Sequence, residues 1–237
     1  MPLSALLLDL DNTAYAYAPC HAAGLAAAQA LAATRLGAWH DPEPFASDYH
    51  HARRRVKARV GERAAAHSRL LYFKQMLETA LGRTDPAWAL ALDTAYWDHY
   101  LEAMARDPGC YEALLAFREA GLRLAWLSDM LTEQQLVKVL ALGLADLAEF
   151  VITSEEAGAE KPDPAGVDLA LARLGVPVAE AWLVGDSLQR DVGAARARGL
   201  TAVWFRRSQA DAPGPVPDHV VDDWFALRTL VEAARHE

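Results

Sequence analysis

Short apolar runs that alternate with helical patterns are the feature that most constrains the fold of this chain. The first run, Ala5-Leu6-Leu7-Leu8, is wholly apolar and is closed by Asp9. A run of this kind is typical of a strand that is buried on both faces, as in a parallel sheet. Comparable runs recur in the second half of the chain, at residues 122–127, 150–153, 181–184, 201–205 and 219–221. The sequence therefore predicts several short strands of one sheet.

Helical segments separate the later strands. The pattern predicts helices over residues 111–120 and 131–142, after Asp163-Pro164, and over 191–198, and a glycine follows each of them. Thr132 and Gln135 fit a capping box at the start of the second helix. Strands that alternate with helices in this way predict an α/β fold with a doubly wound, mostly parallel sheet of Rossmann-like type.

Residues 15–106 break this alternation. The segment shows no strand pattern, and its Ala-rich and Arg-rich stretches have the spacing of helices that present one apolar face. We therefore expect an all-helical module inserted after the first strand. The expected domains are an α/β catalytic core formed by residues 1–14 and 107–237 and a helical cap formed by residues 15–106.

Composition limits the partners of the chain. It has 237 residues, of which 53% are hydrophobic and 23% charged, and a formal net charge of −9. This balance is typical of a soluble globular protein, and the negative charge argues against nucleic acid or an anionic membrane as a partner. The two cysteines form no CxxC pair and no secretion signal is recognisable, so a cytoplasmic location is expected. Nothing in the sequence indicates an oligomeric state.

Polar residues cluster where the expected strands end. In an open parallel sheet the carboxyl ends of the strands meet at one edge, and ligands bind in the crevice there. Two carboxylates that are two residues apart can both face such a crevice. We therefore expect one convergent site from the following residues: Asp9, Asp11, Ser128, Asp129, Lys161, Asp186 and Asp191.

The order of these clusters resembles the haloacid dehalogenase-like hydrolase superfamily over essentially the whole chain. The segment Asp9-Leu10-Asp11-Asn12-Thr13 resembles its first motif, Ser128 the second, Lys161 the third, and residues 185–191 the fourth. The helical insertion is similar to the cap of the phosphatase subfamily that includes phosphoglycolate phosphatases and many nucleotidases. One departure is Asp129, which stands where Asn or Gly is common and adds a negative charge.

The resemblance implies a Mg²⁺-dependent phosphatase that acts on a small phosphorylated metabolite. Asp9 would be the nucleophile and form an aspartyl phosphate, and Asp11 would be the general acid and base. Mg²⁺ would be held by Asp9, Asp186 and the backbone carbonyl of Asp11, with Asp191 acting behind these ligands.

The phosphate of the substrate has its own expected residues. Ser128, Asp129 and Lys161 would lie at the phosphate, with Lys161 supplying positive charge. Tyr15 and Tyr17 follow the first motif and would either stack on the substrate or pack at the start of the cap.

Three other functions remain open at this point. A 2-haloacid dehalogenase uses the same aspartate nucleophile, but its first motif lacks the second aspartate that is present here as Asp11. A phosphomutase shares both carboxylates and differs only in the acceptor of the phosphoryl group. A protein that binds a phosphorylated metabolite without catalysis would normally have lost one of the catalytic groups.

Overall fold

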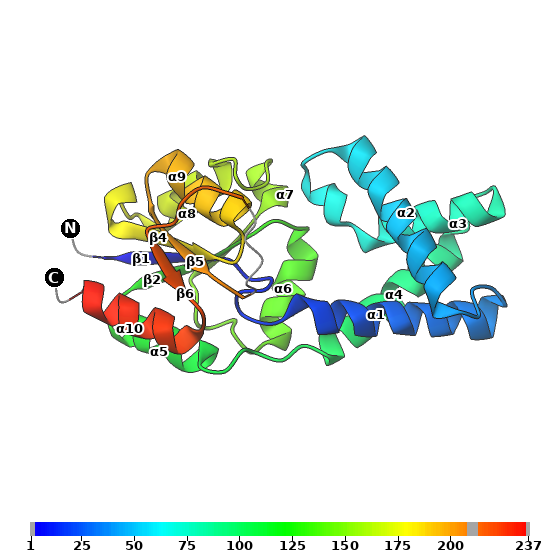
Figure 1. Ribbon diagram of the computed structural model, residues 1–237, viewed down its shortest axis with the longest axis horizontal. Coiled ribbons are helices and arrows are strands. Elements are labelled where there is room, and N and C mark those ends of the chain that lie inside the picture. Colours follow the sequence, from blue (N-terminus) through cyan, green and yellow to red (C-terminus); the bar gives the residue numbers. More distant parts are fainter. Residues whose placement is uncertain (1–2, 208–212, 236–237) are drawn as a thin grey trace. The chain divides into compact units, whose positions relative to one another are not determined.

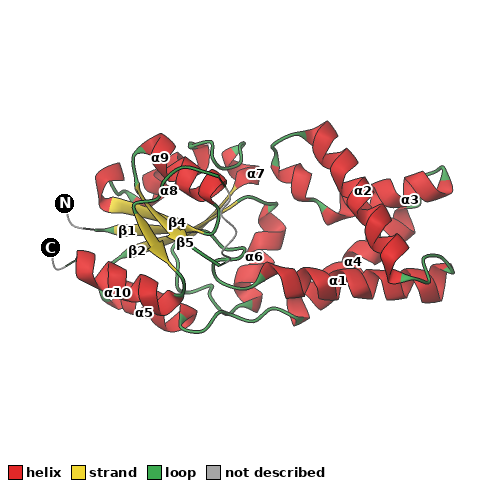
Figure 2. Cartoon of the chain, viewed as in Figure 1, coloured by secondary structure: helices red, strands yellow, loops and turns green. Residues whose placement is uncertain are grey.

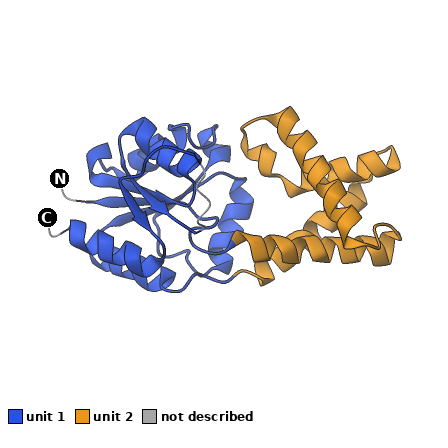
Figure 3. Ribbon diagram, in the orientation of Figure 1, with its two compact units in different colours: residues 1–16, 105–237 blue, residues 17–104 orange. Residues whose placement is uncertain are grey.

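The chain forms two compact units, each with its own packing. The computed structural model describes residues 3–207 and 213–235. Residues 1–16 and 105–237 form one unit, here called the core unit, and residues 17–104 form the other, here called the helical unit (Figure 3). The helical unit is thus an insertion between two segments of the core unit.

A six-stranded sheet forms the centre of the core unit, and all its neighbouring strands are parallel (Figure 1). The strand order is β3-β2-β1-β4-β5-β6. The strands are β1 (Ala5–Leu8), β2 (Arg123–Ser128), β3 (Phe150–Thr153), β4 (Ala181–Gly185), β5 (Thr201–Phe205) and β6 (His219–Val221). The doubly wound α/β class predicted from the sequence is confirmed.

Strand β1 occupies the position where the strand order reverses. Leu8 is in register with Trp126 of β2 on one side and with Val184 of β4 on the other. The residues that follow these three strands therefore leave the same edge of the sheet, next to one another. In α/β sheets this reversal creates the crevice in which ligands bind.

Helices cover both faces of the sheet. Figure 1 shows α5 and α10 side by side on one face and α8 and α9 on the other. The side facing α8 and α9 holds an apolar cluster that includes Leu7, Leu127 and Leu183 from the strands and Val167 from α8. The helices of this unit are α5 (Cys110–Glu119), α6 (Thr132–Ala141), α7 (Ser154–Ala157), α8 (Ala165–Leu174), η3 (Val178–Glu180), η4 (Leu188–Val192), α9 (Gly193–Arg198) and α10 (Trp224–Ala234).

The helical unit contains helices and loops only, in agreement with its sequence pattern (Figure 2). Its interior is aromatic: Phe45, Tyr49, Phe73 and Tyr96 are buried and their rings contact one another. The helices are α1 (Tyr17–Leu31), η1 (Ala32–Leu36), α2 (Pro42–Val60), η2 (Ala64–His67), α3 (Arg69–Leu81) and α4 (Pro86–Glu102). None of the helices in residues 3–207 and 213–235 combines the length and apolar character needed to span a membrane.

One local prediction was wrong. The capping box expected at the start of α6 does not form: Leu131 is the N-cap residue, and the backbone N–H of Thr132 donates instead to Glu155. The side chain of Gln135 points to other partners, described below. A capping box does form at α7, where Thr153 and Glu156 bond reciprocally to each other's backbone N–H. The pattern of Thr132 and Gln135 alone does not predict this result, because it does not show that the Gln135 side chain has other hydrogen-bond partners, Asp11 and Ser128, in the folded protein.

Candidate active site

Asp9 lies directly after β1 and is almost completely buried. Its backbone N–H continues the pairing with β4 by donating to the carbonyl of Val184, at 2.9 Å. Its carboxylate accepts from Lys161 Nζ at 2.7 Å through one oxygen and from Thr13 Oγ1 at 3.1 Å through the other. The sheet thus fixes the backbone of Asp9, and two neighbours fix its carboxylate.

Lys161 is a buried cation that joins several elements. Its Nζ donates to Asp9 at 2.7 Å, to Asp191 at 2.6 Å and to the carbonyl of Leu127 at 3.0 Å. Burial alone would lower its pKa, but the carboxylates of Asp191 and Asp9 raise it well above the usual range. Lys161 is therefore charged and places one positive charge among the carboxylates of the site.

Asp129 positions Lys161. One of its oxygens accepts from the backbone N–H of Lys161 at 2.9 Å, and the other pairs with Arg190 at 3.2 Å. Both oxygens are therefore engaged with protein donors, and a carboxylate offers no donor to a phosphate. The carboxylate of Asp129 therefore holds the backbone that carries Lys161, and the place of Asp129 at the phosphate stays a prediction.

Three carboxylates converge beside Lys161. Asp9, Asp186 and Asp191 each offer an oxygen, and these atoms lie within 4.8 Å of one another. Burial, followed by the nearby carboxylates, raises the pKa of Asp9, and the same causes raise the pKa of Asp186 to about 6. Crowded, desolvated carboxylates of this kind are stabilised by a cation. Oxygen-only donors at this spacing fit Mg²⁺.

Asp191 is the most deeply held of the three carboxylates in its hydrogen bonding and is 2% exposed. Its oxygens accept from Lys161 Nζ and, at 2.9 Å, from the backbone N–H of Ser187. Its Cγ would lie 2.2 Å from a Cβ placed on Gly185, so the glycine leaves the space that Asp191 fills. An indirect role for Asp191 stays a prediction.

Asp11 faces a different set of partners, most of them from α6. Its carboxylate accepts from Lys138 Nζ at 2.7 Å, from Gln135 Nε2 at 3.0 Å and from the hydroxyl of Tyr15. Burial alone would raise the pKa of Asp11, but Lys138 and these hydrogen bonds lower it to about 2. The side chain of Asp11 is absent from the carboxylate trio, and its backbone carbonyl stays the predicted metal ligand at this residue.

Gln135 and Lys138 were missed by the sequence analysis. Both are fully buried on α6, although long polar side chains are seldom buried without a partner. Gln135 also donates to Ser128 Oγ at 2.8 Å, which links the last residue of β2 to Asp11. The sequence shows only that these two polar residues are three positions apart on a short helix. This spacing places them on the same face of the helix but does not show which residues that face contacts.

The backbone of the first motif is held by residues from the C-terminal part of the chain. Asn12 adopts a positive φ of 64°, and its side chain hydrogen-bonds Asp186. Its carbonyl accepts from Arg207 Nε at 2.6 Å, and the carbonyl of Thr13 accepts from Trp224 Nε1 at 2.9 Å. Asparagine tolerates this left-handed conformation better than most residues, which accounts for its presence at the turn.

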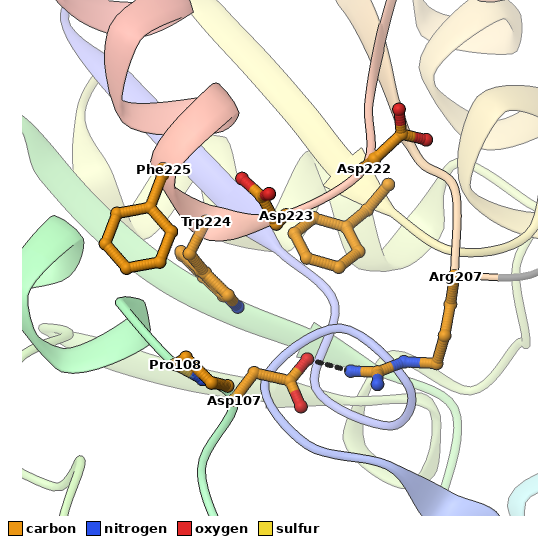
Figure 4. Close-up of a pocket in the computed structure, with 8 residues that line it drawn as sticks. Asp107, Pro108, Arg207, Asp222, Asp223, Trp224 and Phe225 are labelled. Atoms are coloured by element: carbon orange, nitrogen blue, oxygen red, sulfur yellow. Dashed lines mark hydrogen bonds and ion pairs between the residues drawn. The ribbon is translucent and has the colours of Figure 1, made fainter.

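A pocket of about 360 Å³ lies next to Arg207, lined mainly by Phe205, Trp224, Phe225 and three aspartates (Figure 4). Its charges are paired locally. Asp107 binds Arg207, Asp222 binds Arg206, and Asp223 caps α10. None of these carboxylates belongs to the trio beside Lys161, so this pocket is separate from the convergent residues.

The two tyrosines named in the sequence analysis have different surroundings. Tyr15 is buried in the core unit, where its hydroxyl donates to the carboxylate of Asp11, an arrangement that favours the packing role among the two that were expected. Tyr17 begins α1 of the helical unit. Its ring stacks on His21, and its hydroxyl accepts from Arg69 at 2.8 Å.

Comparison with known proteins agrees with this geometry. The model of the haloacid dehalogenase-like hydrolase family matches residues 3–199. A ribulose-1,5-bisphosphate 5-phosphatase from Halopiger xanaduensis is 46% identical, over 96% of this chain and 99% of that protein. A plasmid-encoded phosphoglycolate phosphatase from Cupriavidus necator is 34% identical, over 68% of this chain and 72% of that protein.

Solved structures share the fold. The chain superposes on a phosphatase of this family from Thermococcus onnurineus with a TM-score of 0.76 and 24% identity, covering 97% of this chain and 98% of that one. A 2-haloacid dehalogenase from Pseudomonas syringae gives the same score and identity over 98% of both chains. Identities this low support the fold but do not separate the two activities. The family model and the sequence relatives together show that this chain is an enzyme that belongs to the haloacid dehalogenase-like hydrolases.

Proposed function

We propose that the protein is a Mg²⁺-dependent phosphatase that hydrolyses a small phosphoester through an aspartyl phosphate on Asp9. The observation that carries this proposal is the arrangement around Asp9. A buried carboxylate lies at the reversal point of the sheet, bound to a buried lysine and adjacent to two further carboxylates. Lys161 and a divalent cation would together offset the charge of a phosphate that enters this acidic site.

The residues present fit a magnesium ion. Asp9 and Asp186 would be its carboxylate ligands, with the backbone carbonyl of Asp11, while Asp191 orients Lys161 and the turn at Ser187. When bound, the ion would neutralise phosphate oxygens and draw the phosphate toward Asp9. The chain itself supplies the nucleophile, the ammonium group of Lys161 and the hydroxyl of Ser128.

The proposed nucleophile is tested by replacing Asp9 with Asn. We expect Asp9→Asn to abolish release of inorganic phosphate from p-nitrophenyl phosphate with Mg²⁺ present, and a chelator to abolish it in the wild type. Asp222→Asn changes a carboxylate that is paired with Arg206 outside the trio, and should keep full activity. Full activity of Asp9→Asn would exclude the aspartyl phosphate.

Asp11 is proposed to relay one proton: it would pass a proton from the adjacent ammonium group of Lys138 to the leaving group, and would later take a proton from the attacking water and return it to Lys138. Its contacts with Lys138 and Gln135 hold the carboxylate in place, and the ionised form is the one that accepts a proton from water. An alkyl alkoxide requires protonation to leave, whereas p-nitrophenolate does not. Asp11→Asn should therefore slow formation of the aspartyl phosphate far more with an alkyl phosphate than with p-nitrophenyl phosphate, in single-turnover experiments. An equal loss on both would remove the acid role.

The proposed substrate is a small phosphorylated sugar or hydroxy acid. The relative with 46% identity over nearly the whole chain is named for ribulose-1,5-bisphosphate, which makes a sugar bisphosphate the first substrate to test. A panel of phosphorylated metabolites assayed for phosphate release would identify the preferred compound. A phosphomutase would instead return an isomer of the substrate without free phosphate, so the same panel separates the two functions.

A further inference from the structure

Gln135 on α6 carries a fully buried amide that joins two residues of the candidate site. Its Nε2 donates to Ser128 Oγ at 2.8 Å and to Asp11 Oδ2 at 3.0 Å. An amide nitrogen has two N–H groups, so both are used within the site. One side chain of the core unit thus connects the last residue of β2 with the segment that follows β1.

The carboxylate of Asp11 decides which way this amide faces. Asp11 forms an ion pair with Lys138 at 2.7 Å, so it is ionised and can only accept hydrogen bonds. The opposite orientation of the amide would place the oxygen of Gln135 against a carboxylate oxygen, and the two would repel each other. Asp11 therefore selects the orientation in which the amide N–H groups face Asp11 and Ser128.

This orientation of the amide has a cost for the fold. Oε1 of Gln135 is buried and accepts no hydrogen bond from the described residues. A buried acceptor without a donor is destabilising, and such groups are rare enough in proteins that each one calls for an explanation. The contact that the same amide makes with Ser128 supplies that explanation.

The orientation of the amide also sets the role of the Ser128 hydroxyl. A hydroxyl has one proton to donate and two lone pairs that accept. Because an amide N–H only donates, Ser128 Oγ is the acceptor in its contact with Gln135, and the hydroxyl proton is left for another partner. Among the described residues, none accepts this proton, although Ser128 is only 2% exposed. Ser128 is therefore a buried donor that is kept for a ligand.

We propose that Gln135 is a positioning residue that holds the Ser128 hydroxyl as a hydrogen-bond donor to the phosphate of the substrate. The proposal rests on the phosphatase function proposed above and adds to it a residue that controls phosphate affinity without contacting phosphate. Asp11 orients the amide, the amide orients the hydroxyl, and the hydroxyl donates to a phosphate oxygen. Without Gln135, the hydroxyl proton would no longer be directed and would spend part of its time away from the phosphate.

The test measures the affinity for inorganic phosphate in the presence of Mg²⁺. Phosphate is titrated calorimetrically, and its inhibition constant is determined against hydrolysis of p-nitrophenyl phosphate. Ser128→Ala should weaken phosphate binding by at least about 10-fold, as for a lost hydrogen bond to a charged group. Gln135→Met, which keeps the length of the side chain and removes the amide, should weaken it by about 3- to 10-fold, as for a lost hydrogen bond between neutral groups.

A double-mutant cycle separates positioning from a general loss of structure. If Gln135 acts through Ser128, Gln135→Met should change phosphate affinity by less than about twofold in a Ser128→Ala background. A merely structural defect would weaken phosphate binding by the same factor in both backgrounds. Gln134→Met is the matched control. It makes the same change at the preceding residue, whose amide oxygen has no hydrogen-bond partner in the described part of the chain, and it should leave phosphate affinity unchanged.

Each outcome decides the proposal. Unchanged phosphate affinity in Gln135→Met or in Ser128→Ala would overturn it, as would equal losses from Gln135→Met in both backgrounds or failure of the wild type to bind phosphate. If Gln135→Met does not fold, Gln135→Leu takes its place in the cycle, and Ser128→Ala still tests the hydroxyl. A wild type that binds phosphate but does not hydrolyse p-nitrophenyl phosphate would overturn the phosphatase function, while the calorimetric cycle would still decide the role of Gln135.

Discussion

At the scale of single residues, the core site depends on how one lysine is held. Lys161 Nζ lies between Asp9 and Asp191, and its backbone is fixed by Asp129. Each carboxylate around it would be destabilised without that charge, because all three are buried or nearly so. The charge of Lys161 is therefore balanced only if Asp191 keeps its position. Gly185 allows this position, because its lack of a side chain leaves the space that Asp191 fills.

Gly185→Ala tests this packing. A Cβ at residue 185 would lie 2.2 Å from Asp191 Cγ, which forces Asp191 away from Lys161. We expect a loss of about 1–3 kcal/mol in stability, as for other overpacked interiors, and a fall in kcat/KM of at least about tenfold. Gly193→Ala is a graded comparison: its φ of −58° suits alanine, but its Cβ would meet Pro162 at 3.0 Å, a tight contact that should cost less than the 2.2 Å overlap at Gly185. Unchanged melting temperature and activity in Gly185→Ala would contradict the close contact.

His21 provides a residue-scale prediction for the helical unit. Burial, with Arg69, His50 and Arg53 nearby, lowers the pKa of His21 to about 4 from about 6.5. The unfolded chain therefore takes up this proton first as the pH falls, and stability is lost between about pH 6.5 and pH 4. From about pH 7.5 to pH 5, urea unfolding should show about 2 kcal/mol more loss for the wild type than for His21→Gln. Equal losses in both proteins would contradict the low pKa.

At the scale of elements, the strands were predictable and the polar faces of the helices were not. Every expected strand is present within one residue of its predicted bounds, because a short, mainly apolar run that ends at a polar residue or a glycine is typical of a strand in a parallel sheet. The clusters that follow β1, β2 and β4 converge for the same topological reason. Helix periodicity, in contrast, could not show that Gln135 and Lys138 turn toward Asp11.

Asp129 illustrates the same limit within a loop. Its sequence position next to Ser128 predicts a place at the phosphate, and this stays a prediction. The backbone N–H of Lys161, which donates to the carboxylate of Asp129, lies 32 positions away in the chain and is brought near only by the path of the chain after β3. Contacts of this kind depend on the tertiary fold and leave no local pattern.

The packing of α1 on α4 gives an element-scale prediction. Gly24 of α1 is buried, and a Cβ there would lie 2.7 Å from the carbonyl oxygen of Tyr96. Alanine is the better helix former by about 1 kcal/mol, but the clash with backbone costs about 1–3 kcal/mol. We therefore expect Gly24→Ala to lower the free energy of unfolding. Ala22→Gly, at an exposed position of the same helix, should lose only the propensity difference. Stabilisation by Gly24→Ala would show that the helices do not approach so closely.

At the scale of the whole molecule, the helical unit is a single insertion into a core that packs without it. Tyr15 and Arg106, on either side of the insertion, form an antiparallel bridge, and the N–H of Asp107 donates to the carbonyl of Ala14 at 2.9 Å. The chain thus leaves and re-enters the core unit at neighbouring points. The apolar cluster beneath α8 and α9 draws all its residues from the core unit.

This organisation predicts that the core unit folds and binds Mg²⁺ by itself. Residues 17–104 would be replaced by a short Gly/Ser linker, and thermal unfolding followed with and without Mg²⁺. Because Asp9, Asp186 and Asp191 all belong to the core unit, Mg²⁺ at about 100 times its Kd should stabilise the shortened protein by about 2.7 kcal/mol. Asp186→Asn in the same background should lose most of this stabilisation, and Asp222→Asn should retain it. A shortened protein that folds without responding to Mg²⁺ would contradict the metal site, and one that does not fold would contradict the independence of the core.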